Sequence, residues 1–258
     1  ILMTSIRPLL PLLIAAGILL AGNGLQGTLI ALRGQQEGFS TGLIGIIGAA
    51  YFAGFFLGCM MITQMLRAVG HIRCFAALAA IAASGTLALV LFIDPVAWIA
   101  LRFLIGFCFA GLFTVMESWI NSSVGNSTRG RATSVYRVID LVGTTLSQFM
   151  IPLFGTTGFT IFGVMAIMIT LSMVPVSLGD RSNPSPPKEL KLDLKSVWLI
   201  SPLACIGSAV AGLANSAFRL VGPLYAQSIG LNVSQIATFI SLGVIGGVAL
   251  VLYLVASR

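Results

Sequence analysis

Residues 98–140 decide the architecture of this chain and read WIALRFLIGFCFAGLFTVMESWINSSVGNSTRGRATSVYRVID. They contain a long apolar run, a short basic loop and the beginning of a second apolar run. Trp98 and Trp119 lie 21 residues apart. In a helix this is about 31 Å, close to the hydrocarbon thickness of a bilayer. Because tryptophan favours both membrane–water interfaces, the pair indicates the two ends of one membrane span.

The composition of the whole chain also indicates a membrane protein. Of the 258 residues, 57% are hydrophobic and only 8% are charged, whereas soluble domains carry about 25% charged residues. We therefore expect an all-α, polytopic membrane helix bundle. The net charge of +7 could suit a nucleic-acid-binding protein, but the basic residues are spread thinly between apolar runs, so we expect no nucleic-acid partner.

Eight apolar runs are long enough to cross a bilayer, since about 20 apolar residues suffice. Small residues let membrane helices approach closely, and we assign Gly45, Gly48, Gly54 and Gly58 to such packing. The eight spans are expected at approximately residues 8–32, 42–66, 72–93, 96–120, 132–154, 158–178, 197–222 and 233–256.

Basic residues are distributed unevenly between the two sides of these spans. Loops on the side of the N-terminus carry eleven lysines and arginines, and the opposite loops carry only Arg33. Cytoplasmic loops have such an excess, so the N-terminus is predicted to be cytoplasmic, in an inner or plasma membrane. His71 is expected to be a solvated residue of one of these cytoplasmic loops.

A proline-rich, charged stretch at 179–196 is predicted to be a cytoplasmic linker that separates two parts of the chain. Residues 1–178 would form a six-helix half, and 197–258 would begin a second half. At an offset of 192 residues, Asn23 matches Asn215, Gly38 matches Gly230, and Gly54 matches Gly246; Gly-Phe-Ser at 38–40 also resembles Gly-Leu-Asn-Val-Ser at 230–234. A parallel repeat of six helices predicts such matches, and the chain is expected to be a piece of a longer protein.

Six spans, a charged linker and a restarting pattern resemble the major facilitator superfamily over the whole chain. The resemblance implies the first eight of twelve helices, arranged in two six-helix halves. In the family's loop motif after the second helix, Gly70 and Arg73 fit, whereas Arg67 stands at the aspartate position and Thr63 at the first glycine. That departure removes the usual loop salt bridge.

Two further motifs bear on the kind of transporter that the resemblance implies. Arg102, Gly106 and Gly111 are similar to the fourth-helix pattern that is associated with proton coupling in the family's antiporters. The fifth-helix glycine-proline motif of drug/proton antiporters is absent from 142–155. The run at 117–121, with the basic residues that follow it, is similar to a bacterial subgroup with mostly unassigned substrates.

Polar residues inside the spans are the candidates for a substrate cavity. Arg102 either snorkels to the outer interface or attracts an anionic substrate group or a carboxylate. Arg219 is expected near the outer mouth, as another snorkelling side chain. Each amide could instead make an interhelical hydrogen bond, but as a set these residues favour a cavity near the midplane. The predicted cavity residues are Asn23, Gln26, Arg102, Gln148 and Asn215.

Charged residues near the cytoplasmic ends of the spans are predicted to form a network that serves as part of an inner gate. Proton binding by Glu117 or Asp140 is the alternative. The network is expected to comprise Arg67, Arg73, Glu117, Arg129, Arg131 and Asp140.

These patterns predict a secondary transporter that moves a small polar or amphipathic solute by alternating access, with protons as a further partner. Multidrug efflux is the alternative within this class, and an integral-membrane enzyme or a nonfunctional fragment are the alternatives outside it. The chain lacks GxSxG, HExxH and Walker-type motifs, which argues against an enzyme and an ATP-driven pump. The four cysteines form no CxxC pair, so neither a metal nor another cofactor is expected.

Overall fold

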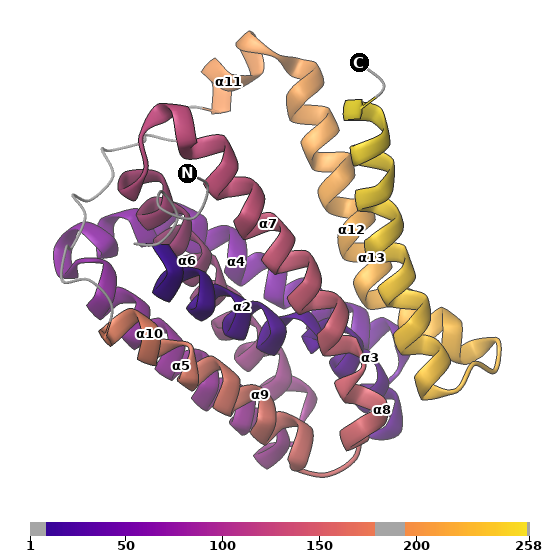
Figure 1. Cartoon of the computed structure of the whole chain (residues 1–258). Helices are drawn as coiled ribbons and strands as arrows, with labels where there is room; N and C mark the ends of the chain where they lie inside the picture. Colours follow the sequence, from indigo (N-terminus) through magenta and orange to yellow (C-terminus); the bar gives the residue numbers. More distant parts are fainter. Residues whose placement is uncertain (1–8, 179–193, 257–258) are drawn as a thin grey trace.

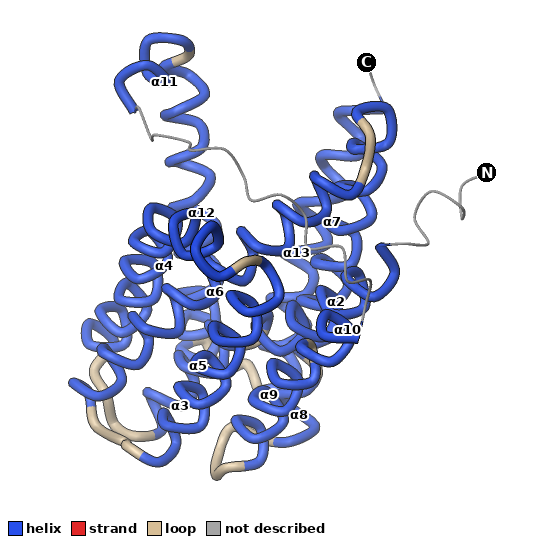
Figure 2. The backbone as a smooth tube through the Cα atoms, turned by 90° about the vertical axis from the view of Figure 1, so that its left-hand side faces the viewer, coloured by secondary structure: helices blue, strands red, loops and turns tan. Residues whose placement is uncertain are grey.

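The computed structural model describes residues 9–178 and 194–256, and every regular element in these ranges is a helix (Figures 1 and 2). Most of the expected linker, residues 179–193, lies outside the described residues, and so does Arg7. The helices are α2 (Leu10–Gly24), α3 (Gln26–Gln36), α4 (Thr41–Val69), α5 (His71–Leu91), α6 (Pro95–Ser123), α7 (Asn126–Gln148), α8 (Met150–Phe154), α9 (Thr160–Leu171), α10 (Met173–Leu178), α11 (Leu194–Ile200), α12 (Pro202–Ser228) and α13 (Val233–Ala256).

Three of the expected spans are interrupted helices. α2 and α3 meet at Leu25, α7 and α8 at Phe149, and α9 and α10 at Ser172. Pro152 and Pro175 lie three residues beyond the last two breaks. A proline lacks the amide hydrogen and crowds the carbonyl four residues earlier, so these two residues explain the breaks at Phe149 and Ser172.

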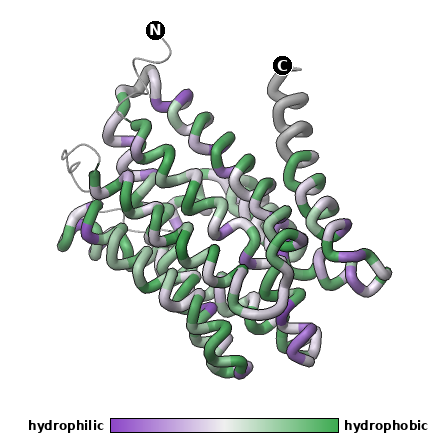
Figure 3. The backbone as a smooth tube through the Cα atoms, turned by 60° about the horizontal axis from the view of Figure 1, so that its bottom comes forward, coloured by the Kyte–Doolittle hydropathy of each residue, from purple (hydrophilic) through white to green (hydrophobic). Residues whose placement is uncertain are grey.

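Six spans are long and apolar enough to cross a membrane: α2–α3, α4, α5, α6, α9–α10 and α12. In Figure 3 the long helix bodies are mostly hydrophobic, and hydrophilic positions gather towards the helix ends. α7 packs against α2 and α13 within the same bundle, although its charged residues lower its hydropathy. The chain is therefore a multi-pass membrane protein with an all-helical fold.

The basic loop expected between the fourth and fifth spans is mostly helix. α6 continues to Ser123 and α7 begins at Asn126. Arg129 and Arg131 therefore lie in the first turns of α7 and are exposed. The loop prediction was wrong here because a short turn suffices to join two antiparallel helices, and the basic residues between the apolar runs are compatible with helix.

Both tryptophans of α6 are buried, although they lie near its two ends as expected. Trp98 is fully buried, its indole N–H donates to the carbonyl of Leu89 (2.9 Å), and its ring meets the edge of Phe39. Trp119 packs edge-on against His71. The two indoles therefore pack inside the protein at the two ends of the span, and their depth at the membrane interfaces stays a prediction.

Glycines bring α4 and α6 into close contact. A Cβ atom at Gly54 would collide with the carbonyl of Phe103, and one at Gly106 would collide with the carbonyl of Tyr51. The two backbones therefore touch directly, as small residues allow in membrane proteins. This contact holds Tyr51 of α4 beside Arg102 of α6.

The other glycines assigned to packing divide into two groups. A Cβ at Gly48 would collide with Leu220 of α12, and one at Gly58 would lie 2.8 Å from the carbonyl of Phe107. A Cβ at Gly45 would have nothing within 4 Å. The packing prediction is thus confirmed for Gly48, Gly54 and Gly58 and wrong for Gly45, which faces away from the neighbouring helices.

The internal repeat has the same local geometry in both copies. Gly38 and Gly230 have φ angles of 80° and 85°, a backbone conformation that glycine adopts readily at the end of a helix. Two residues later, Ser40 caps α4 by accepting from the amide of residue 43 (3.3 Å), and Asn232 caps α13 by accepting from the amide of residue 235 (2.9 Å). The structure therefore aligns Ser40 with Asn232 and not with Ser234, because the capping oxygen must stand at one fixed position.

α12 and α13 contact the helices of the first six spans at one end. α12 packs against α3 and α4, and α13 packs against α7 and α8. The packed part of α12 is its C-terminal third, where Leu220 and Leu224 join Ala31 and Ile44 in a small apolar cluster; residues 202–214 are mostly exposed. Figure 1 shows both helices diverging from α7 towards α11 and the C-terminus.

Candidate functional site

A cavity of about 280 Å³ lies between the first six spans and the pair α12–α13. Sites for small molecules begin at about this size. Side chains of α2, α3, α4, α6, α7, α12 and α13 line it. The lining includes all five residues predicted from the sequence: Asn23, Gln26, Arg102, Gln148 and Asn215.

Arg102 is buried at one end of the cavity, with 3% of its surface exposed. Its Nη1 donates to Oε1 of Gln26 (2.7 Å), and its guanidinium carbon lies 4.4 Å from the ring centre of Tyr51. An amide oxygen and an aromatic face both favour a cation. The snorkelling alternative is therefore excluded, because the side chain points into the protein and not towards the interface.

Gln148 holds the interrupted first span in place. Its Nε2 donates to the carbonyl of Gly24 (2.9 Å), and its Oε1 accepts from the hydroxyl of Thr28 (2.9 Å). Gly24 precedes the break between α2 and α3 at Leu25, so the amide replaces backbone bonding that the break weakens. Both ends of the Gln148 amide are thus engaged within the protein.

The second set of helices contributes Asn215 and Arg219 to the cavity. Nε of Arg219 donates to Oδ1 of Asn215 (3.2 Å). A Cβ at Gly27 would lie 3.2 Å from the carbonyl of Arg219, so the absence of a side chain there lets α12 approach the beginning of α3. Arg219 lines the cavity, so its side chain does not snorkel to the outer interface as expected.

Three charged residues lie in another part of the cavity. Arg137 contacts Glu117 at 3.2 Å and Asp140 at 3.7 Å, and Asp140 also accepts from the hydroxyl of Thr144 (3.4 Å). Glu117 lies 15 residues beyond Arg102 on α6, which is about 22 Å along the helix. The cavity therefore carries an acid–base cluster well separated from the buried arginine.

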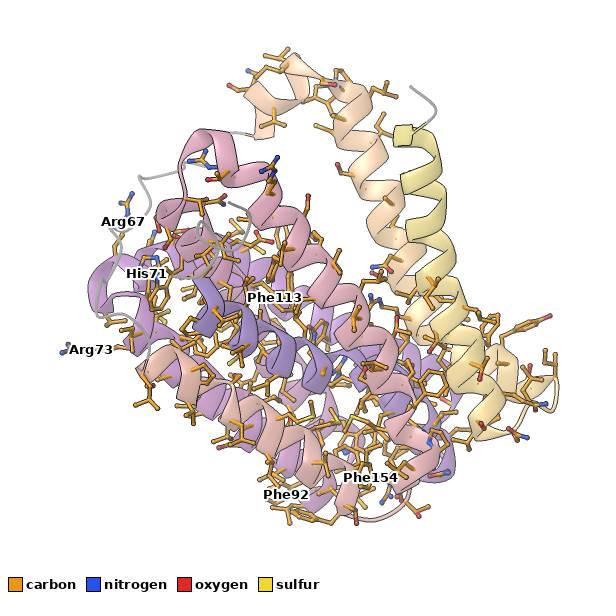
Figure 4. All side chains as sticks on the ribbon, viewed as in Figure 1. Arg67, His71, Arg73, Phe92, Phe113 and Phe154 are labelled. Carbon is orange, nitrogen blue, oxygen red and sulfur yellow. The ribbon has the colours of Figure 1, made fainter. Side chains whose placement is uncertain are left out.

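Aromatic rings line the cavity between these two charged parts. Tyr51 and Phe55 of α4 have ring centres 6.2 Å apart, and Phe55 and Phe113 have ring centres 6.0 Å apart. Phe113 lies in the middle of the bundle in Figure 4. Such rings offer large apolar contact with a definite geometry, so the middle of the cavity suits an apolar or aromatic group.

The members of the predicted cytoplasmic charge network lie in two places. Glu117 and Asp140 line the cavity, but the four predicted basic members, Arg67, Arg73, Arg129 and Arg131, are not among its lining residues. Figure 4 shows Arg67 and Arg73 at the edge of the bundle. Among residues 9–178 and 194–256, both acids form ion pairs with Arg137. The four basic residues lie at the end of α4 and at the beginnings of α5 and α7.

His71 is buried at the beginning of α5 and is not a solvated loop residue. Its Nε2 lies 3.0 Å from the hydroxyl of Ser118, and its ring packs against Trp119. The expected loop is reduced to Gly70, whose φ of 81° allows α4 to turn directly into α5. His71 therefore joins α5 to α6 and lies outside the cavity.

Sequence reasoning missed Tyr51 and Arg137, and it did not assign Arg219 to the cavity. Tyr51 stands three residues before the contact glycine Gly54, which was a usable signal for a position facing α6. Arg137 lies one helical turn from Asp140 and is one of the eleven basic residues expected on the cytoplasmic side. The pairing of Arg137 with Glu117 depends on how α6 and α7 cross, and no local sequence pattern predicts this crossing.

Comparisons with known proteins agree with this arrangement. The family model described as Major Facilitator Superfamily matches residues 12–258. The protein named "Uncharacterized MFS-type transporter YcaD", from Escherichia coli O45:K1 (strain S88 / ExPEC), is 26% identical over 256 residues. That match covers 94% of this chain and 65% of the relative, so the chain spans about two-thirds of the length of that protein.

Two solved transporters share the fold. The crystal structure of the nucleoside transporter NupG has a TM-score of 0.74, with 14% identity, and the match covers 95% of this chain and 66% of that one. A bacterial homologue of the human lysosomal transporter Spinster, in an inward-facing and unoccupied conformation, has a TM-score of 0.72 with 14% identity, covering 93% of this chain and 59% of that one.

Proposed function

The chain belongs to the major facilitator superfamily, and we propose that it moves a small polar or amphipathic solute across the membrane by alternating access. The observation that carries this proposal is the cavity, whose lining comes from both the first spans and α12–α13. Asn23 and Asn215 enter it at positions that correspond in the repeat. Transporter substrates bind near the midplane where two repeats meet.

The proposal divides the chain into a six-helix half at 1–178, a linker at 179–196 and the beginning of a second half at 197–258. The matching geometry at Gly38 and Gly230 supports this division. Because the chain spans 65% of the length of the YcaD protein, transport is proposed for the whole protein to which this chain corresponds.

The proposed orientation has the N-terminus and the linker in the cytoplasm, in an inner or plasma membrane. The excess of basic residues on that side supports it. α12 and α13 contact the first half at the opposite end, around Gly38 and Gly230, and diverge towards the basic end (Figure 1). The conformation would then be inward-facing, with the cavity open to the cytoplasm.

In this mechanism the two halves rock about the bound solute. The outer contacts, where Gly27 meets Arg219 and Gly48 meets Leu220, would separate in the outward-facing state. Glu117, Arg137 and Asp140 line the open end and would form part of the inner gate, because their ion pairs are exposed here and would become buried on closure. Exposed ion pairs are weak, which suits a contact that must open and close.

A flux screen tests the proposed function. The full-length protein is reconstituted in proteoliposomes, and uptake of radiolabelled solutes is measured with and without an imposed pH gradient. Saturable flux that is lost in Asn215→Leu supports the proposal. Asn232→Leu, which changes the same residue type at a helix cap outside the cavity, serves as the control for reconstitution. Turnover of a substrate without net flux would favour an integral-membrane enzyme instead.

A further inference from the structure

The side chains that line the cavity carry more positive than negative charge. The described lining contains Arg102, Arg137 and Arg219 and two carboxylates. Both carboxylates lie against Arg137. Among the residues that the structure describes, Arg102 and Arg219 have only the neutral oxygens of Gln26 and Asn215 as hydrogen-bond acceptors.

Donor groups at the Arg102 end of the cavity are left without acceptors. Within the described part of the chain, Nε of Arg102 and Nε2 of Gln26 are buried and make no hydrogen bond, and both side chains are 3% exposed. Buried polar atoms in native proteins nearly always have a partner, and an exception calls for an explanation. Both unpaired groups are N–H donors, so the missing partner is an acceptor.

The two arginines converge from different sets of helices. Arg102 stacks on Tyr51, and Arg219 lines the same cavity as these two side chains. The backbone of Arg219 meets Gly27, the residue next to Gln26. An anion bound here would therefore touch α3, α6 and α12 together. Since burying a charge without a counter-ion is costly in a membrane protein, the anion would also offset the charge of Arg102.

The cavity wall next to the two arginines indicates the chemical nature of the rest of the bound anion. Phe55 lies one helical turn from Tyr51 on α4, and its ring contacts that of Phe113. The wall beyond the two arginines is therefore aromatic, whereas the acid–base cluster of Glu117 lies further along α6. An anionic head at the arginines places an apolar or aromatic body against these rings.

We propose that the cavity selects small amphipathic organic anions, with Arg102, Gln26 and Arg219 binding the anionic head and Phe55 and Phe113 contacting the body. This substrate class rests on the proposed transport function and refines it. Arginine suits the role because its planar guanidinium donates two parallel hydrogen bonds to a carboxylate, sulfonate or phosphate.

Binding of probes matched in shape tests the charge preference. Benzenesulfonate, neutral benzenesulfonamide, cationic benzyltrimethylammonium and inorganic phosphate are titrated against the purified full-length protein in detergent by isothermal calorimetry. We expect benzenesulfonate to bind more tightly than the other three. Phosphate lacks the aromatic body, so its weaker binding separates an amphipathic site from a simple anion site.

Variants then locate the site. Arg219→Gln is expected to weaken benzenesulfonate binding about tenfold or more, since a charge-assisted hydrogen bond is lost, and Arg219→Lys is expected to restore part of it. Arg73→Gln removes an exposed arginine outside the cavity and is expected to change nothing. Arg219 is the first choice because it is only partly buried, so its replacement disturbs folding less than a change at Arg102.

The proposal is overturned if the sulfonamide binds as tightly as the sulfonate, if no probe binds, or if Arg219→Gln binds the sulfonate as the unchanged protein does. The flux screen separates this result from the transport function itself. Saturable flux of a neutral or cationic solute alone would overturn the anion preference and leave transport in place. Tight binding of the sulfonate without flux of any solute would support the anion preference and overturn the transport function.

Discussion

A guanidinium inside a membrane protein costs at least a few kcal/mol of stability unless it is compensated, and Arg102 is compensated by neutral groups. Gln26 supplies an amide oxygen and Tyr51 supplies a ring face. Together these contribute on the order of 2–4 kcal/mol. Because they offset the charge without neutralising it, the residue keeps a positive field in the cavity.

Gln148 is expected to support the interrupted first span more than it supports solute recognition. Gln148→Leu leaves the carbonyl of Gly24 without its side-chain partner, so we expect the free energy of unfolding to fall by about 1–3 kcal/mol. Chemical denaturation in detergent measures this. Gln64→Leu, on an exposed position of α4, is the control. An unchanged stability in Gln148→Leu would show that water or another group satisfies the carbonyl.

Glu117 and Asp140 are expected to act in the gate and not as proton carriers. Glu117→Gln and Asp140→Asn should each slow solute flux several-fold, because closure of the inner end loses an ion pair with Arg137. The dependence of flux on an imposed pH gradient should stay as it is in the unchanged protein. Loss of that dependence in either variant would contradict the gate role and identify the proton-binding group.

At the scale of the element, the contact between α4 and α6 depends on glycine. Gly54 and Gly106 allow each backbone to touch the carbonyl oxygens of the other helix. This contact sets the relative depth of Tyr51 and Arg102, so the stacking of the two side chains follows from the helix crossing. Breaks at Leu25, Phe149 and Ser172 likewise adjust the spans around the cavity without ending them.

Alanine substitutions test this contact with a matched control. Gly54→Ala places a methyl group against the carbonyl of Phe103, and we expect it to lower the free energy of unfolding by about 1–3 kcal/mol. Gly45→Ala lies on the same helix with nothing within 4 Å, so its stability should stay the same or rise slightly because alanine favours helix. Equal effects of the two substitutions would contradict a specific contact.

At the scale of the whole molecule, the two sets of helices meet through small contacts at one end. Gly27 receives the carbonyl of Arg219, and Gly48 receives Leu220. Contacts of this kind can separate and re-form as whole bodies move, because few side chains interlock. The inward-facing conformation proposed above therefore depends on a few glycine positions, where a larger side chain can be introduced by mutation.

Gly27→Val is expected to shift the protein towards the outward-facing state, because the added side chain displaces Arg219. The readout is the reaction of Asn215→Cys with a membrane-impermeant thiol reagent, in a protein whose four native cysteines are replaced by alanine. Labelling from the outside should increase and labelling from the cytoplasm should decrease. Gly42→Val, at a position with nothing within 4 Å, is the control. Unchanged labelling in Gly27→Val would contradict the proposed outer contact.

The sequence by itself determined the helical membrane fold, the approximate spans and the polar residues of the cavity. Long apolar runs can satisfy their backbone in a bilayer only as helices, and polar side chains stand out in them, as Arg102, Asn23 and Asn215 do. Only the tertiary structure decided which charges pair, that Arg219 and Tyr51 join the cavity, and that His71 and the two tryptophans are buried. Those outcomes depend on the angles and faces at which the helices pack, and this packing is determined jointly by residues that are far apart in the chain.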